Sequence, residues 1–174
     1  MLGVNLVFAG FALTLNGVSY LIKVDDKVKA LANVLIGIVI GTNAVFQTSQ
    51  AVELESTMHF GFSAAMWMFA LNYIIIAAHI FFKSDNWKVF GLYALFAAIV
   101  SFIFAGDTAM ALEHGAPWEM VYLWLMWAFL WTQSFLAILF GMKAVDKFSP
   151  HILILNGVAS TFVPGMLILL GVIL

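Results

Sequence analysis

The sequence predicts an all-α integral membrane protein with six transmembrane helices, and three observations predict this fold class. Of its 174 residues, 64% are hydrophobic and only 9% are charged, whereas a soluble domain carries about 25% charged residues. Six apolar stretches are each long enough to cross a bilayer, for which a helix needs about 20 residues. All seven lysines fall in alternate connections between these stretches.

The apolar stretches are continuous and lack the alternation of a barrel strand, so helices are the expected form. We expect spans near residues 4–22, 30–48, 60–82, 89–106, 120–142 and 152–174. They make residues 1–174 one transmembrane domain, with five short connections and no room for a soluble domain. The opening MLGVNLVFAG has no positive region and no small-residue cleavage pattern after it, so it is interpreted as a retained first helix.

Positive and negative charges are sorted between the connections. The first, third and fifth connections contain every lysine: Lys23, Lys27, Lys29, Lys83, Lys88, Lys143 and Lys147. The ionisable residues of the second and fourth connections are only acids and histidines: Glu53, Glu55, His59, Asp107, Glu113, His114 and Glu119. Because lysines favour the cytoplasmic side, the odd-numbered connections are predicted to be cytoplasmic and both termini to be outside.

The lysine connections also repeat. Lys23, Lys83 and Lys143 are spaced sixty residues apart, and they open the similar turns KVDDK, KSDNWK and KAVDK. Each turn joins two spans, which predicts a helical hairpin used three times by internal duplication. Three hairpins around one axis would enclose a central pore.

Composition excludes several classes of function. There is no arginine and the net charge is −2, so no nucleic-acid partner is expected. There is no cysteine, and the spans hold almost no ionisable group apart from His79, interpreted as an interfacial residue at a helix end. Enzymes and ion-coupled transporters place ionisable groups inside their spans. We therefore expect no enzyme activity, no cofactor and no metal site.

Aromatic residues form two stripes. Trp124, Trp127 and Trp131 lie at i, i+3 and i+7 of the fifth span, and Phe69 and Tyr73 lie at i and i+4 of the third. Such stripes are typical of packing. They would also suit a cavity for a small, planar, neutral solute, because uncharged walls give ions no substitute for their hydration. Neutral polar residues in the spans are expected to bond across helix interfaces.

Several segments together resemble one known family. They are the opening MLG, Asn16-Gly17 followed by LIKVD, the helix WLMWAFLW, the turn KFSP at 147–150, and a second Asn-Gly in the sixth span. Over the whole chain the sequence resembles the AmiS/UreI family of urea and short-chain amide channels. The resemblance implies a six-helix protomer with its own pore, assembled as a homo-hexameric ring in the bacterial cytoplasmic (inner) membrane. It implies passive permeation of urea, acetamide or formamide to a cytoplasmic urease or amidase.

The resemblance also carries over site residues. The family's pore constrictions fall on Leu2, Leu6, Leu13, Phe69, Tyr73, Trp124, Trp127, Leu130 and Trp131. Asn156 stands where the family's best-known members place a buried glutamate, so we expect it at the pore without any role that needs a carboxylate. Urea and the small amides are not distinguished by these residues.

The outer connections offer a candidate pH-sensing rim: His59, His114, Glu53, Glu55, Glu113 and Glu119. Histidines titrate in the range that such a sensor needs. However, these connections are shorter than those of the acid-gated gastric members, and the alternative is a solvated rim without strong acid gating. Two other functions stay open at this point. An ion-coupled transporter of a small metabolite predicts a titratable residue at mid-membrane, and an accessory membrane subunit without transport needs no aromatic stripe.

Overall fold

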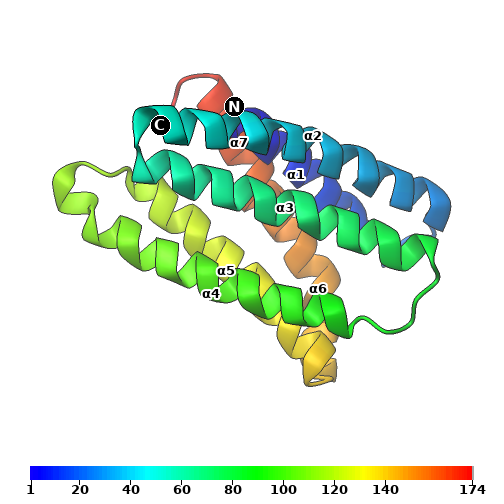
Figure 1. Cartoon of the computed structure of the whole chain (residues 1–174). Coiled ribbons are helices and arrows are strands. Elements are labelled where there is room, and N and C mark those ends of the chain that lie inside the picture. The colour runs from blue at the N-terminus through cyan, green and yellow to red at the C-terminus, as the bar shows by residue number, and fades with distance from the viewer. Residues whose placement is uncertain (174) are drawn as a thin grey trace.

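Long helices make up almost the whole chain and run side by side in one bundle (Figure 1). The computed structural model describes residues 1–173, apart from the side chain of Thr57. The helices are α1 (Leu2–Val18), α2 (Asp26–Leu54), α3 (Thr57–Phe81), α4 (Lys88–Met110), the short 3₁₀ helix η1 (Leu112–His114), α5 (Trp118–Leu139), α6 (Lys143–Asn156), the π-helix η2 (Gly157–Phe162) and α7 (Val163–Leu169).

The segments α6, η2 and α7 follow one another without a break and form what is called here the last helix. Within residues 1–173, five helices are long and apolar enough to cross a membrane, counting the last helix as one, and α1 is shorter with 17 residues. The chain is therefore an all-helical, multi-pass membrane protein, as predicted. In Figure 1 both termini lie at the end of the bundle where α2 turns into α3 and α4 into α5.

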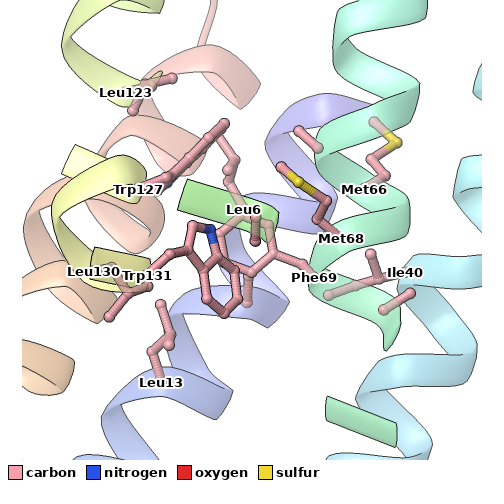
Figure 2. Packing of buried hydrophobic residues seen from close by; sticks show 14 of the residues in the cluster. Leu6, Leu13, Ile40, Met66, Met68, Phe69, Leu123, Trp127, Leu130 and Trp131 are labelled. Carbon is pink, nitrogen blue, oxygen red and sulfur yellow. The ribbon is translucent and has the colours of Figure 1, made fainter. Parts of the chain in front are cut away.

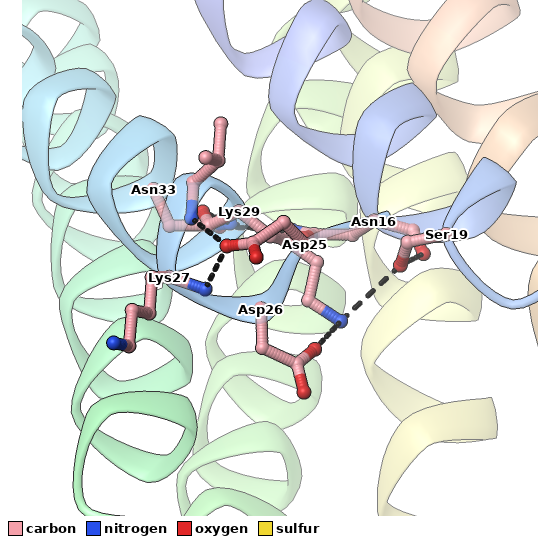
Figure 3. Close-up of polar contacts among 8 residues, drawn as sticks. Asn16, Ser19, Asp25, Asp26, Lys27, Lys29 and Asn33 are labelled. Carbon is pink, nitrogen blue, oxygen red and sulfur yellow. Dashed lines mark hydrogen bonds and ion pairs between the residues drawn. The ribbon is translucent and has the colours of Figure 1, made fainter. Parts of the chain in front are cut away.

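Capping residues set the helix ends, and several helices extend beyond the predicted membrane spans. The Asp25 carboxylate accepts the backbone N–H groups of Lys27 at 2.9 Å and Val28 at 3.0 Å (Figure 3). Because these N–H groups have no partner inside the helix, α2 begins at Asp26 and not near residue 30. It also continues to Leu54, beyond the predicted end at residue 48.

The second connection is consequently very short. Glu55 adopts the left-handed conformation with φ of 48°, and the Ser56 hydroxyl accepts the N–H of His59 at the start of α3. Glu53 and His59, both predicted to lie in a loop, belong to the last turn of α2 and the first turn of α3. The last helix likewise runs from Lys143 to Leu169, whereas the predicted span covers 152–174.

Close packing pairs the helices differently from the predicted hairpins. The closest neighbours are α2 with α3, α4 with α5, and α1 with the last helix, whereas α3 and α4 touch only lightly. Glycines permit these approaches: a β-carbon placed on Gly37 would lie 2.9 Å from Ile74, and one on Gly10 would lie 2.6 Å from the Gly157 carbonyl oxygen. Small residues are the usual means of close helix approach in membranes. The helices joined by lysine connections (α1 with α2, α3 with α4, α5 with α6) are in contact over less of their length.

The π-helix has a local cause. Proline has no N–H, so Pro164 cannot bond to the Ser160 carbonyl four residues earlier. The Ser160 and Thr161 hydroxyls donate to the Asn156 carbonyl oxygen at 2.8 Å and 3.2 Å, and this keeps the widened turn satisfied. The widened turn starts at Gly157, the residue that meets Gly10.

Neutral polar side chains join α1 to α2, as predicted for polar groups in the spans. Asn16 and Asn33 exchange two amide hydrogen bonds of 2.9 Å and 3.0 Å. Near the other end of α1, the Asn43 amide donates to Asn5 at 2.8 Å. Figure 3 shows Asn16 and Asn33 close to the start of α2, where Lys27 and Lys29 lie.

Candidate functional site

A cavity of about 780 Å³ opens among the helices at one end of the bundle. Its outer part is lined by charged residues from the three lysine connections and the adjoining helix ends, namely Asp26, Lys29, Lys83, Asp85, Lys88 and Asp146. We call this end the lysine end and the opposite one the acidic end. Deeper in, the cavity is lined by neutral residues of five helices, and its deepest members are Leu13, Asn72, Leu130 and Trp131.

Beyond these residues the free space almost disappears. A second hollow of about 10 Å³ is lined by Leu2, Asn5, Leu6, Ile40, Ala65, Met66, Phe69 and Trp127. That volume is close to the minimum that holds one water molecule. The path through the bundle is therefore wide at the lysine end and closed between Leu13 and Leu2.

Aromatic rings make the closure, and we call Phe69, Trp124, Trp127 and Trp131 the aromatic plug. Phe69 meets Trp127 edge-on, with ring centroids 5.3 Å apart, and Trp131 at a tilt, with centroids 5.7 Å apart. Trp124 meets Trp127 edge-on at 5.1 Å. Figure 2 shows Phe69 of α3 facing Trp127 and Trp131 of α5, with Leu6 and Leu13 of α1 beside them. Edge-on contacts suit the charge distribution of aromatic rings.

Two tyrosines hold the plug in place. The Tyr73 hydroxyl donates to the Ala9 carbonyl oxygen at 2.9 Å, and its ring stacks on Phe69. The Tyr93 hydroxyl donates to the Met68 carbonyl oxygen, and its ring meets Trp131 edge-on at 6.0 Å. Sequence reasoning missed Tyr93. Nothing in its apolar neighbourhood distinguishes it from the many other aromatic residues of α4.

The walls of the closed region are neutral and contain unused hydrogen-bond donors. Within the described residues, every fully buried polar side chain is uncharged. The indole N–H groups of Trp127 and Trp131 are buried, and neither has a partner in the described part of the chain. A buried donor without an acceptor costs about 1–3 kcal/mol. The plug therefore presents two N–H groups in position to donate to a passing acceptor.

A family model described as AmiS/UreI family transporter matches residues 1–172. The chain belongs to the AmiS/UreI family. Among curated proteins, it is 26% identical to the acid-activated urea channel of Helicobacter pylori over 97% of both chains. It is also 26% identical to a putative amidate substrates transporter protein of Mycolicibacterium smegmatis, over 97% of this chain and 76% of that one. The resemblance noted from the sequence is thereby confirmed.

Solved structures agree with this assignment. The fold is similar to a cryo-electron microscopy structure of the H. pylori urea channel in a closed state, with a TM-score of 0.82, 25% identity and 98% of both chains covered. A crystal structure of the urea channel from the same organism gives a TM-score of 0.81 over 100% of both chains, at 24% identity. The architecture is thus that of known channels, and these relatives are channels or transporters, not enzymes.

The structure brings most of the residues carried over from the family to this one region. Leu2, Leu6, Phe69 and Trp127 line the small hollow, and Leu13, Leu130 and Trp131 line the cavity. Tyr73 and Trp124 are buried next to them.

Asn156 is placed elsewhere. Its amide nitrogen donates to the Ile152 carbonyl oxygen at 3.2 Å, and its side-chain oxygen accepts the Ser160 hydroxyl at 3.1 Å. It is fully buried inside the last helix and does not line the cavity or the hollow in the described part of the molecule. Its polar atoms are used within the last helix, and a pore-lining role for Asn156 stays a prediction.

The residues of the candidate pH-sensing rim all lie at the acidic end, but no ion pair among the described residues joins them to one another. His59 contacts the Ser56 hydroxyl at 2.9 Å. His114 is exposed at the end of η1 and Glu119 lies in the first turn of α5. In residues 1–173, no ion pair joins either histidine to Glu53, Glu55 or another carboxylate.

Proposed function

We propose that this protein is a passive channel for urea or short-chain amides such as acetamide and formamide. One observation carries the proposal: the buried indole N–H groups of Trp127 and Trp131 have no partner in the described chain, and both indole rings lie against the ring of Phe69. A carbonyl oxygen is the acceptor that would satisfy them. A planar solute matches the flat ring faces. The urea and amide relatives support the same solute class.

The neutral walls favour a channel over an ion-coupled transporter. Coupling to an ion needs a titratable or charged group that the ion can bind inside the membrane. The polar side chains buried in the described part of the chain are asparagine, glutamine, serine and threonine. They hydrogen-bond a neutral solute but replace the hydration shell of an ion poorly.

Permeation requires the aromatic plug to open. The hollow beside Phe69 and Trp127 is no larger than a water molecule, and urea has four heavy atoms. Side-chain rotation of Leu6, Leu13 and the plug rings would admit a flat solute edge-on, since rotamer changes are much faster than helix movement.

The proposal extends to topology and assembly. We place the lysine end in the cytoplasm, because all seven lysines lie there, and both termini outside. We count α1 as a sixth crossing: although it is only about 26 Å long, it packs against the last helix from Gly3 at Gly165 to Gly17 at Pro150. A hexamer in the bacterial inner membrane, supplying a urease or amidase, follows the family resemblance.

The test is solute flux into proteoliposomes, measured by stopped-flow light scattering with urea, acetamide and formamide. Wild-type protein should pass at least one of them well above protein-free vesicles. Trp131→Phe keeps the ring but removes the N–H, so it should lower this flux. Trp131→Ala should widen the slot and reduce discrimination between urea and larger amides.

If Trp131 only packs, Trp131→Ala should instead lose about 3–5 kcal/mol of stability and leave selectivity per folded channel unchanged. Trp118→Phe is the matched control, because Trp118 is exposed at the start of α5 and lies outside the plug. Folded wild-type protein that passes none of the three solutes would refute the proposed function.

A further inference from the structure

One polar side chain beside the plug makes no hydrogen bond within the described residues. Asn72 lies on α3, is only 1% exposed, and lines the cavity with Trp131. Its carbonyl oxygen is fully buried and accepts no hydrogen bond in the described part of the chain. Most other buried polar side chains are satisfied, as Asn16 and Asn33 are by each other. Asn72 is therefore built into the wall without a structural partner.

The position of Asn72 follows from helix geometry. It comes three residues after Phe69, so it lies on the same side of α3, about 4.5 Å further along the helix toward the lysine end. The next residue, Tyr73, is fixed by its hydrogen bond to Ala9, and this holds the backbone of α3 in register here. A solute that leaves the space between Phe69 and Trp131 meets Asn72 as it enters the cavity.

The two unpartnered groups at this point have opposite polarity. Trp131 offers an N–H donor, whereas Asn72 offers a carbonyl oxygen, the one carbonyl oxygen among the unpartnered buried side-chain atoms of the described chain. A primary amide carries the matching pair, a carbonyl oxygen that accepts and an NH₂ group that donates. The unpartnered N–H donors of the plug can hydrogen-bond only to the carbonyl oxygen of the solute. An acceptor is needed to bind its NH₂ group.

We infer that Asn72 determines specificity by accepting an N–H of the permeant where the aromatic plug opens into the cavity. This inference rests on the proposed function and goes further, because it names the residue that recognises the NH₂ group of the permeant. A solute with the same carbonyl but fewer N–H groups has fewer ways to donate to Asn72 while its carbonyl accepts from the plug, and where it places no N–H there it leaves the Asn72 oxygen unpaired. Buried groups left unpaired are an effective basis for discrimination.

Acetamide and N-methylformamide test this directly, because they are isomers of equal mass that carry two N–H groups and one. Their fluxes are measured in proteoliposomes, with protein-free vesicles subtracted. Wild-type protein should favour acetamide, and Asn72→Leu should lower the acetamide to N-methylformamide ratio by about 2–10-fold, as the loss of one net hydrogen bond predicts. Asn72→Thr retains a hydroxyl acceptor and should keep most of the ratio.

The matched control is Ser134→Ala. Ser134 lines the same cavity, but its hydroxyl already donates to the Leu130 carbonyl oxygen and accepts from Gln133, so the ratio should stay at the wild-type value. If Asn72→Leu is not recovered folded, Asn72→Ala takes its place beside Asn72→Thr. An unchanged ratio in a folded Asn72 variant, or an equal fall in Ser134→Ala, would overturn the assignment of Asn72 alone. Wild-type vesicles that pass neither solute would overturn the proposed function as well.

Discussion

Replacing Gly10 by alanine should destabilise the bundle where α1 meets the last helix. The added β-carbon would lie 2.6 Å from the Gly157 carbonyl oxygen and 2.8 Å from both the β-carbon and the backbone nitrogen of Phe162. None of these atoms can rotate away, so the cost belongs at the upper end of the range for overpacking, about 3 kcal/mol. Alanine recovers about 1 kcal/mol through its better helix propensity. The expected net loss is therefore about 2 kcal/mol.

Gly106→Ala is the matched control. Gly106 is also helical, but a β-carbon there would meet no described atom within 4 Å. This substitution should gain up to about 1 kcal/mol, so the two variants should differ by about 3 kcal/mol. At about 2–4 °C per kcal/mol for a chain of this length, their melting temperatures in the same detergent should differ by about 6–12 °C. Equal melting temperatures would refute the close approach of α1 to the last helix.

Two further predictions concern topology and gating. Cysteines placed at Asp25, Asn86 and Ala144, all at the lysine end, should react in intact cells only with membrane-permeant reagents, whereas a cysteine at Gly115 should react with impermeant ones. Labelling of Asn86→Cys by an impermeant reagent would reverse the proposed orientation. Urea flux should change less than about 3-fold between pH 5 and pH 7.5, roughly 0.7 kcal/mol of barrier, because neither His59 nor His114 pairs with a carboxylate in the described chain. A 10-fold rise on acidification that disappears in a His59→Ala, His114→Ala double variant would contradict this.

The tryptophan stripe of the plug was predictable because helical spacing puts its members on one face, whereas its contact with Phe69 depends on how α3 packs against α5. Trp124, Trp127 and Trp131 share a face of α5 at i, i+3 and i+7, and all three are buried along about two turns of that helix. The charge pattern was equally informative, since bilayer thickness and the preference of lysine for one side act on any membrane helix.

Other features depend on interactions that a hydropathy pattern does not contain. The start of α2 is set by the Asp25 carboxylate, which caps a helix that begins at Asp26, four residues before the predicted apolar span. The pairing of α1 with the last helix depends on which glycines face each other across 147 residues of chain, Gly10 and Gly157. The bonding of Asn156 depends on a π-turn that follows from Pro164.

The unequal division of the path has a consequence for transport rate. The cavity carries the solution of one compartment as far as Leu13, so the steep part of the concentration gradient is confined to the segment between Leu13 and Leu2. Eleven helical residues span about 16 Å, roughly half of the 30 Å hydrocarbon core. The resistance of a narrow passage to diffusion increases in proportion to its length. In the proposed channel a solute would therefore cross a narrow segment only about half as long as the hydrocarbon core is thick.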